Sequence, residues 1–302
     1  MPRGYVVGLG FLAAVWGASY LFIKVAVEDG IEPAPMMFFR TGVAALLLLP
    51  FVLARSGAGR GARELRRAWR PGLVLGLVNA AIPFTLIAWG EKHIDSGVAA
   101  IANATVPLFV VLLALRFQPS ERPDAAKLAG VLIGLVGVAV LAGGQPDGGL
   151  WAVAGTLAVV VASLAYAAGA LYGAARTGDT TGPVLATVSM AGAALLLAPL
   201  AVLQFPDELP GWKALASVAA LTVLGTALAQ LVLFRLLRLY GSARTSLVTY
   251  LMPPTALLYG VLLLDEPLSV AALVGLLLIL PAVALGSGAV RLPRRAAVVQ
   301  AP

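Results

Sequence analysis

Long apolar runs recur along almost the whole chain, and they constrain its fold more than any other feature of the sequence. None of the runs contains an Asp or a Glu residue. A helix needs about 20 apolar residues to cross the hydrocarbon core of a bilayer, and each run comes close to that length. The predicted spans cover residues 5–27, 36–54, 71–90, 96–115, 126–143, 151–173, 183–203, 214–234, 245–264 and 269–290.

The amino-acid composition points to the same class of protein. Hydrophobic residues make up 60% of the 302 residues and charged residues only 12%, whereas charged residues make up about 25% of a soluble globular protein. The chain has no cysteine and a single histidine, His93. These counts exclude disulfides, a cysteine nucleophile and a polyhistidine metal site within one chain. We therefore expect an all-α integral membrane protein that needs no metal and no cofactor.

The distribution of charge predicts the orientation. Most of the 21 Lys and Arg residues, including those of the 55–70 connection, fall in one alternate set of connections, and the other set holds most of the acidic residues. Basic loops stay in the cytoplasm, so we expect a multi-pass protein of the bacterial cytoplasmic (inner) membrane with both termini inside. The net charge of +7 is spread between the apolar runs, which argues against a nucleic-acid partner.

The two halves of the sequence resemble each other. The matching segments and landmarks are 44–50 with 193–199, 96–107 with 242–253, Glu121 with Glu266 and Gly130 with Gly275. Each half holds five predicted helices, and because five is odd the second half has to enter the membrane from the opposite side. Inverted repeats of this kind are common in transporters, which bind their solute between the repeats near the midplane. We therefore predict two repeats, residues 1–145 and 146–302, around a central cavity.

Short motifs in both halves resemble those of one transporter family. They are Trp16-Gly17-Ala18-Ser19, Lys24, Phe39-Arg40, Pro107, Glu121, Gly130 and Gly137 in the first half, and Ser242, Tyr250-Leu251, Pro253, Asp265-Glu266-Pro267-Leu268-Ser269 and Gly275 in the second. Their order resembles two EamA-type repeats of the drug/metabolite transporter superfamily over nearly the whole chain. The resemblance implies a ten-helix, inverted-repeat fold with a central cavity that moves small metabolites such as amino acids, often outward. Residues 118–121 depart from the pattern, because an apolar-Gly-Glu turn is usual there.

Neutral polar side chains within the spans are candidates for the solute site. A polar group in a membrane helix is unfavourable unless it faces protein or a water-filled cavity, and several of these residues fall on one face of their helix. The predicted substrate-binding residues are Trp16, Ser19, Tyr20, Asn79, Trp89, Asn103, Tyr166, Thr226, Gln230 and Tyr250. Alternatively, the Ser and Thr hydroxyls bond to carbonyls of their own helix, and the aromatic side chains lie at the membrane interface.

Lys24 and Arg40 are the notable charged residues inside the predicted spans. Both lie toward the outer ends of their helices, where they would attract an anionic group of a solute to the mouth of the cavity. Alternatively, they extend to the interface or pair with Glu28, Asp29 or Glu32.

Prolines and glycines indicate where the helices bend and where they pack. Pro83, Pro107, Pro253 and Pro254 lie inside spans, where each removes a backbone donor. We interpret Pro107 and Pro253 as paired kinks that help to gate alternate sides; simple packing kinks are the alternative. Gly130, Gly134 and Gly137 give the fifth predicted helix a closely approachable face, and the family resemblance implies that this helix packs against the tenth, away from the cavity.

We hypothesise a monomeric secondary transporter that exports a small neutral or zwitterionic metabolite by alternating access. Its partners are the small-molecule solute and the lipid bilayer. An enzyme would need a nucleophile with a base, or a metal cluster, at membrane depth, and the spans offer neither. A multidrug or cation exporter of the same fold and a noncatalytic membrane scaffold or receptor remain as alternatives. The solute and the coupling stay open, with uniport, exchange or proton coupling through Glu91, His93 or Asp95 all compatible with the sequence.

Overall fold

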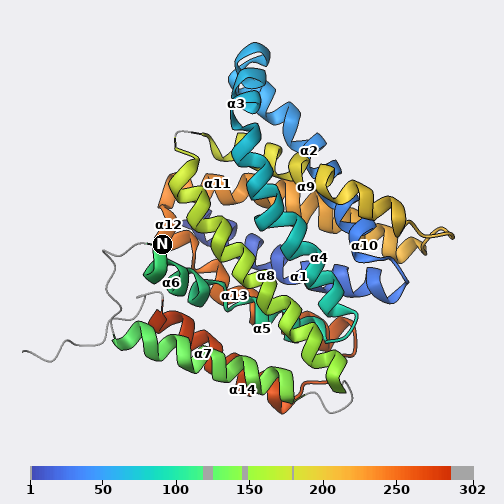
Figure 1. The fold of residues 1–302 in the computed structure, drawn as a ribbon, viewed down its shortest axis with the longest axis vertical. Helices are drawn as coiled ribbons and strands as arrows, with labels where there is room; N and C mark the ends of the chain where they lie inside the picture. Colours follow the sequence, from blue (N-terminus) through green and yellow to red (C-terminus); the bar gives the residue numbers. More distant parts are fainter. Residues whose placement is uncertain (1, 118–124, 145–148, 179, 287–302) are drawn as a thin grey trace, which may run out of the picture.

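The structure, a computed structural model, describes residues 2–117, 125–144, 149–178 and 180–286, and all regular elements of these residues are helices (Figure 1). In the first half they are α1 (Arg3–Glu28), α2 (Pro33–Ser56), α3 (Ala58–Gly76), the π-helical η1 (Leu77–Ala81), α4 (Ile82–Glu91), α5 (Ser96–Asn103), α6 (Val106–Phe117) and α7 (Ala125–Gly143). In the second half they are α8 (Gly149–Arg176), α9 (Gly182–Leu203), α10 (Trp212–Thr222), the π-helical η2 (Val223–Leu228), α11 (Ala229–Tyr240), α12 (Ser242–Thr245), α13 (Val248–Leu263) and α14 (Val270–Gly286). The landmark Glu121 and the 118–121 stretch lie outside the described residues.

The helices account for the predicted spans in order. Eight continuous helical segments are long and apolar enough to cross a membrane, and two shorter apolar helices, α13 and α14, follow them. The described residues are thus all-helical apart from short connections, which agrees with the fold class expected from the sequence. The number of membrane crossings, ten, stays a prediction, as does the 145/146 boundary between the halves.

Two π-helical segments occupy matching places in the two halves. The starts of η1 and η2, Leu77 and Val223, are as far apart in sequence as Pro107 and Pro253. Pro83 is the second residue after η1 and has no N–H to continue the α-helical pattern. No proline follows η2, where the Thr226 hydroxyl instead donates to the carbonyl of Leu221 at 3.0 Å. Both π-helical turns interrupt an α-helix. A proline accompanies the first, and a side-chain hydroxyl accompanies the second.

The predicted proline kinks take different forms. A turn at 104–105 separates α5 from α6, and Pro107 is the second residue of α6. In the second half the chain breaks earlier, at 246–247, and Pro253 and Pro254 lie inside α13. The matched prolines therefore do not mark equivalent breaks, and a gating role for them stays a prediction.

Close helix pairs hold the bundle together. The pairs α7–α14 and α2–α9 make the most extensive contacts, and Figure 1 shows α7 and α14 side by side at one edge of the molecule. Gly130 permits the first of these contacts, because a Cβ atom there would lie 2.6 Å from the backbone oxygen of Ala282. The sequence-based expectation that the helix of Gly130 packs against the last helix is thus confirmed.

Replacing Gly130 with alanine should destabilise the protein. The added methyl group would meet backbone atoms of α14 that cannot move aside alone, and overpacking of this kind costs about 1–3 kcal/mol. Thermal unfolding in detergent, followed by tryptophan fluorescence, measures the effect. Gly10→Ala is the matched control, because nothing lies within 4 Å of its Cβ position and alanine is the better helix former. Equal unfolding temperatures for the two variants would contradict the packing account.

Candidate functional site

A buried arginine lies between the two halves of the bundle. Arg40 of α2 is only 5% exposed, and its Nε donates a hydrogen bond of 2.9 Å to the Thr226 hydroxyl of η2. Its guanidinium carbon lies 3.8 Å from the ring centroid of Phe84 on α4, a cation–π contact. The Met37 sulfur, at 3.8 Å from Nη1, is a further neutral partner. Among the described residues, no carboxylate forms an ion pair with this charge.

A chain of hydrogen bonds runs beside Arg40 from α1 to α8. The Asn103 amide nitrogen donates to the Tyr20 hydroxyl at 2.8 Å, and the Ser163 hydroxyl donates to the Asn103 amide oxygen at 3.2 Å. Tyr166 packs edge-on against Phe84, with ring centroids 6.4 Å apart. Three helices from both halves thus contribute neutral polar groups close to one buried cation.

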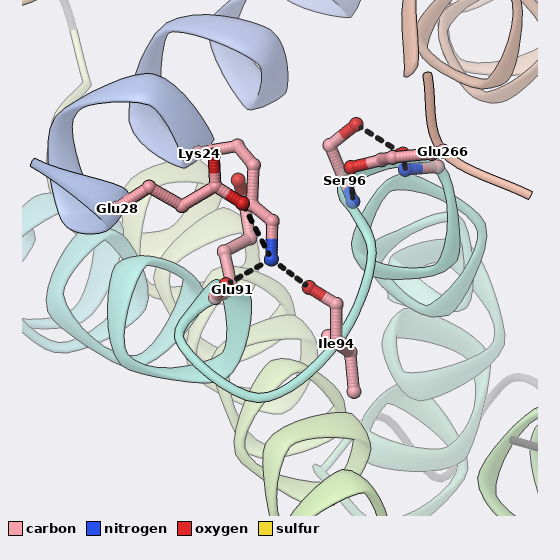
Figure 2. A network of polar contacts seen from close by, with 7 residues as sticks. Lys24, Glu28, Glu91, Ile94, Ser96 and Glu266 are labelled. Atoms are coloured by element: carbon pink, nitrogen blue, oxygen red, sulfur yellow. Dashed lines mark hydrogen bonds and ion pairs between the residues drawn. The ribbon is translucent and has the colours of Figure 1, made fainter. Parts of the chain in front are cut away.

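The structure separates Lys24 from Arg40, although the sequence placed both at the mouth of a cavity. Lys24 lies near the end of α1, where its ammonium group pairs with Glu28 at 3.5 Å and donates to the backbone oxygens of Glu91 and Ile94 (Figure 2). Arg40 instead meets Thr226, which stands midway along the continuous helix Trp212–Tyr240. Lys24 therefore stabilises one end of the bundle, and Arg40 brings its charge to the interior.

Of the other predicted site residues, two from α1 face η2. The Trp16 indole donates to the Gly225 backbone oxygen at 3.2 Å, and the Ser19 hydroxyl returns to the carbonyl of Val15 in its own helix. The alternative considered for serines and threonines applies to Ser19. Both side chains lie next to the widened turn and outside the hydrogen-bonded chain of Tyr20.

The remaining predicted residues make none of the contacts with Arg40 described above. Asn79 of η1 packs against Gly169 of α8, where no larger residue would fit. Trp89 joins an aromatic group with His93 and the 64%-exposed Trp151, an arrangement typical of the membrane interface. Gln230 of α11 is half-buried, and Tyr250 of α13 packs against the main core.

The sequence reasoning did not single out one residue of this region and placed another one elsewhere. Phe84, which stacks on Arg40, gave no signal in the sequence, because a cation–π contact depends on the tertiary fold. Glu91 was placed in the connection beyond a predicted span, but it is the last residue of α4 and is fully buried. Its position directly after an apolar run was the available signal.

Two pockets lie away from this region. One of about 480 Å³ is formed by the 206–211 turn beside Asp29, and one of about 800 Å³ lies on the flank of the bundle between α2, α3 and α9. Neither is lined by a predicted site residue. The groups around Arg40 are instead packed against one another, and an open central cavity stays a prediction.

A carboxylate from the second half caps the start of α5. Glu266, in the connection between α13 and α14, accepts hydrogen bonds from the backbone N–H and the hydroxyl of Ser96, at 2.7 and 2.8 Å (Figure 2). Asp95, the residue before α5, makes no such cap. Because the N–H groups at a helix start carry partial positive charge, an anion is stabilised there.

Removing this cap should destabilise the protein. Glu266→Ala leaves the Ser96 donors buried without their acceptors, which costs about 1–3 kcal/mol. Glu266→Gln keeps an acceptor oxygen but loses the charge, so we expect a smaller loss. Glu208→Ala, on an exposed turn, serves as control. Thermal unfolding ranks the three variants, and an equal effect of the changes at Glu266 and Glu208 would show that the cap contributes nothing.

Two side chains in the connection between α4 and α5, His93 and Asp95, have shifted pKa values. Burial raises the pKa of the Asp95 carboxyl above its ordinary value of 3.8, and the nearby Glu266 carboxylate adds to this, against the opposing effect of Lys24. Burial also lowers the pKa of His93, helped by Lys92 and Lys24. At neutral pH the imidazole is therefore uncharged.

Asp95→Asn should stabilise the protein in a pH-dependent way. The folded protein binds the Asp95 proton more tightly than the unfolded chain does, so this group reduces stability as the pH rises above 3.8. The asparagine variant lacks this penalty, and its unfolding temperature should exceed that of the wild type at neutral pH but not below pH 3.8. Unfolding curves at both pH values test this, and the same gain at each would contradict it.

Comparison with known proteins identifies the family to which this chain belongs. The model of the EamA-like transporter family matches residues 4–143 and again residues 153–287. The uncharacterized inner membrane transporter YedA of Escherichia coli (strain K12) is 30% identical over 262 residues, which cover 85% of this chain and 82% of that protein. The probable terminal-alkyne amino-acid exporter of Streptantibioticus cattleyicolor is 29% identical over 270 residues, with 86% and 85% covered.

A solved structure shares the fold. It is described as "Crystal structure of protein" and has a TM-score of 0.65, with 20% sequence identity over 96% of this chain and 98% of that one. This likeness concerns the fold alone, whereas the two family matches cover almost the entire sequence. The chain belongs to the EamA-like transporter family of the drug/metabolite transporter superfamily, as the order of its motifs indicated.

Proposed function

We propose that this protein is a secondary transporter that exports a small zwitterionic metabolite, such as an amino acid, across the cytoplasmic membrane by alternating access. It acts as a monomer with both termini in the cytoplasm. The observation that carries the proposal is the buried charge of Arg40, which has neutral partners among the described residues. The printed name of the Streptantibioticus relative, an amino-acid exporter, supports both the solute class and the direction.

Arg40 has the chemistry to bind a carboxylate. A guanidinium group carries five N–H donors in a planar fork that fits a carboxylate with two parallel hydrogen bonds. In this structure one donor is used by Thr226 and one by the weakly accepting sulfur of Met37. An unpaired charge is expensive in a membrane interior, so a bound anionic group would offset an existing cost.

The neighbours of Arg40 suit the remainder of a small polar solute. Tyr20 and Asn103 are buried and present a hydroxyl and an amide from different helices. Phe84 and Tyr166 provide aromatic surface on the side of α4 and α8. A pocket with a few oriented polar groups on an apolar wall is the usual composition of a small-molecule site.

The cation-exporter alternative is disfavoured by the same residue. A fixed buried positive charge repels an organic cation, and like-charge contacts in a site cost several kcal/mol. A zwitterion brings its own carboxylate to Arg40 and therefore avoids this repulsion.

Arg40→Gln should impair transport of carboxylate-bearing solutes. Purified protein is reconstituted into vesicles, and counterflow is measured with a panel of radiolabelled L-amino acids and other small metabolites. Loss of a charge-assisted pair costs about 1.5–3 kcal/mol, so the affinity should fall about 10- to 150-fold. Arg40→Lys keeps the charge without the fork and should retain part of the affinity.

Arg235→Gln, on the exposed face of α11, is the matched control and should transport normally. Folding of each variant is checked by its unfolding temperature. Unchanged counterflow in a folded Arg40→Gln variant would remove Arg40 from the site, and the absence of counterflow for the whole panel in the wild type would overturn the proposed transport.

A further inference from the structure

Glu91 is a buried titratable residue that has no role in the solute site proposed above. It is fully buried, and both of its carboxyl oxygens lack a hydrogen-bond partner. In Figure 2 no dashed line reaches this carboxyl group, although the backbone oxygen of the same residue accepts a bond from Lys24 at 2.9 Å. An isolated carboxylate without partners is very costly in such surroundings, whereas the neutral acid is tolerated.

The nearest cation cannot satisfy this carboxyl group in the present conformation. A lysine ammonium has three donors, and those of Lys24 are directed to the Glu28 carboxylate and to the backbone oxygens of Glu91 and Ile94. The neutral acid form of Glu91 needs no cation as its partner, and the side chain is fully shielded from solvent in this conformation.

The other charged and titratable groups around Glu91 come from four elements. They are Tyr20, Lys24 and Glu28 of α1, Arg40 of α2, Glu266 of the α13–α14 connection, and Asp95 of the connection that follows Glu91. Two cations and three further acids surround the site, so loss or gain of one proton at Glu91 changes the charge balance of the whole region.

Glu91 also stands at a suitable place relative to Arg40. Phe84, which stacks on the Arg40 guanidinium, and Glu91 are seven residues apart on α4 and so face the same side of this helix, about 10 Å apart along its axis. Two charge-assisted contacts of about 2.8 Å and the width of a small amino acid span a similar distance. A zwitterion bound to Arg40 by its carboxylate is therefore long enough for its ammonium group to reach Glu91.

We propose that Glu91 is the proton-binding residue of the transport cycle, and that a proton and the ammonium group of the solute compete for its carboxylate. This inference rests on the proposed transport of a zwitterion. On the loading side the ammonium group pairs with Glu91, whose O–H bond breaks and whose proton enters the water on that side. On the release side a proton from the water bonds to the carboxylate, and the ammonium group leaves. Each cycle exchanges one zwitterion for one proton.

The test compares two transport modes of reconstituted protein. Vesicles of phosphatidylethanolamine and phosphatidylglycerol contain unlabelled L-amino acids for counterflow and none for accumulation, and a radiolabelled mixture of L-amino acids is added outside. Counterflow without a pH difference reports solute exchange alone, and accumulation against an imposed difference of one pH unit reports coupling to protons. For the wild type we expect both modes, with accumulation of up to about tenfold. Glu91→Gln should lose accumulation and keep counterflow at reduced affinity, because the amide oxygen still accepts a hydrogen bond from the ammonium group but carries no charge.

Glu208→Gln is the control, because Glu208 lies on an exposed turn and is not among the groups that surround Glu91. It should retain both modes. If Glu91→Gln fails to fold, Glu91→Asp keeps a carboxyl group and should retain coupling with an altered pH dependence. Counterflow without accumulation in the wild type, or accumulation by Glu91→Gln, would overturn the role of Glu91 and leave transport standing. Wild-type protein with neither mode would overturn the transport proposal itself.

Discussion

Inside a bilayer each backbone N–H and C=O group has to find its hydrogen-bond partner within the protein, and the rest of this structure depends on that constraint. At three of the helix interruptions, a side chain from another element supplies a partner for the backbone. Glu266 binds the start of α5, and the Trp16 indole binds a carbonyl of the widened turn η2. Lys24 binds the last carbonyl of α4 and one carbonyl of the connection that follows it. The interruptions thus determine where polar and charged side chains gather, and these are the places where a solute can be recognised.

The helices could be predicted from the sequence because burial in lipid demands long apolar segments, and such segments leave a direct record in the order of residues. The site could be predicted only in part. Tyr20 and Asn103 were identified as polar groups on interior faces, but their mutual hydrogen bond joins residues far apart in the chain. Arg40 was placed at the mouth of a cavity, with pairing to acids nearby in the sequence as the alternative, whereas its contacts come mainly from α4 and η2. Such pairings depend on how helices cross, which no local pattern encodes.

The buried charges illustrate how stability and function oppose each other in a membrane protein. Replacing Arg40 or Glu91 with an apolar residue would remove a desolvation cost, so neither residue is what packing alone would select. Their surroundings reduce this cost without cancelling it. Arg40 has an aromatic face and a hydroxyl beside it, and Glu91 has three ammonium donors nearby that are directed elsewhere. An incompletely satisfied group retains the capacity to bind something from outside the protein.

The π-helical turns change which face of the helix the residues after them occupy. A π turn contains one residue more than an α turn, and one residue corresponds to about 100° around an α-helix. A helical wheel drawn without interruption through α10, η2 and α11 therefore assigns the wrong face to every residue after Leu228. Thr226 lies within η2 and meets Arg40, whereas Gln230, placed on the same stripe by ideal periodicity, does not. Scanning mutagenesis of this helix therefore needs one helical wheel for the residues before η2 and another for those after it.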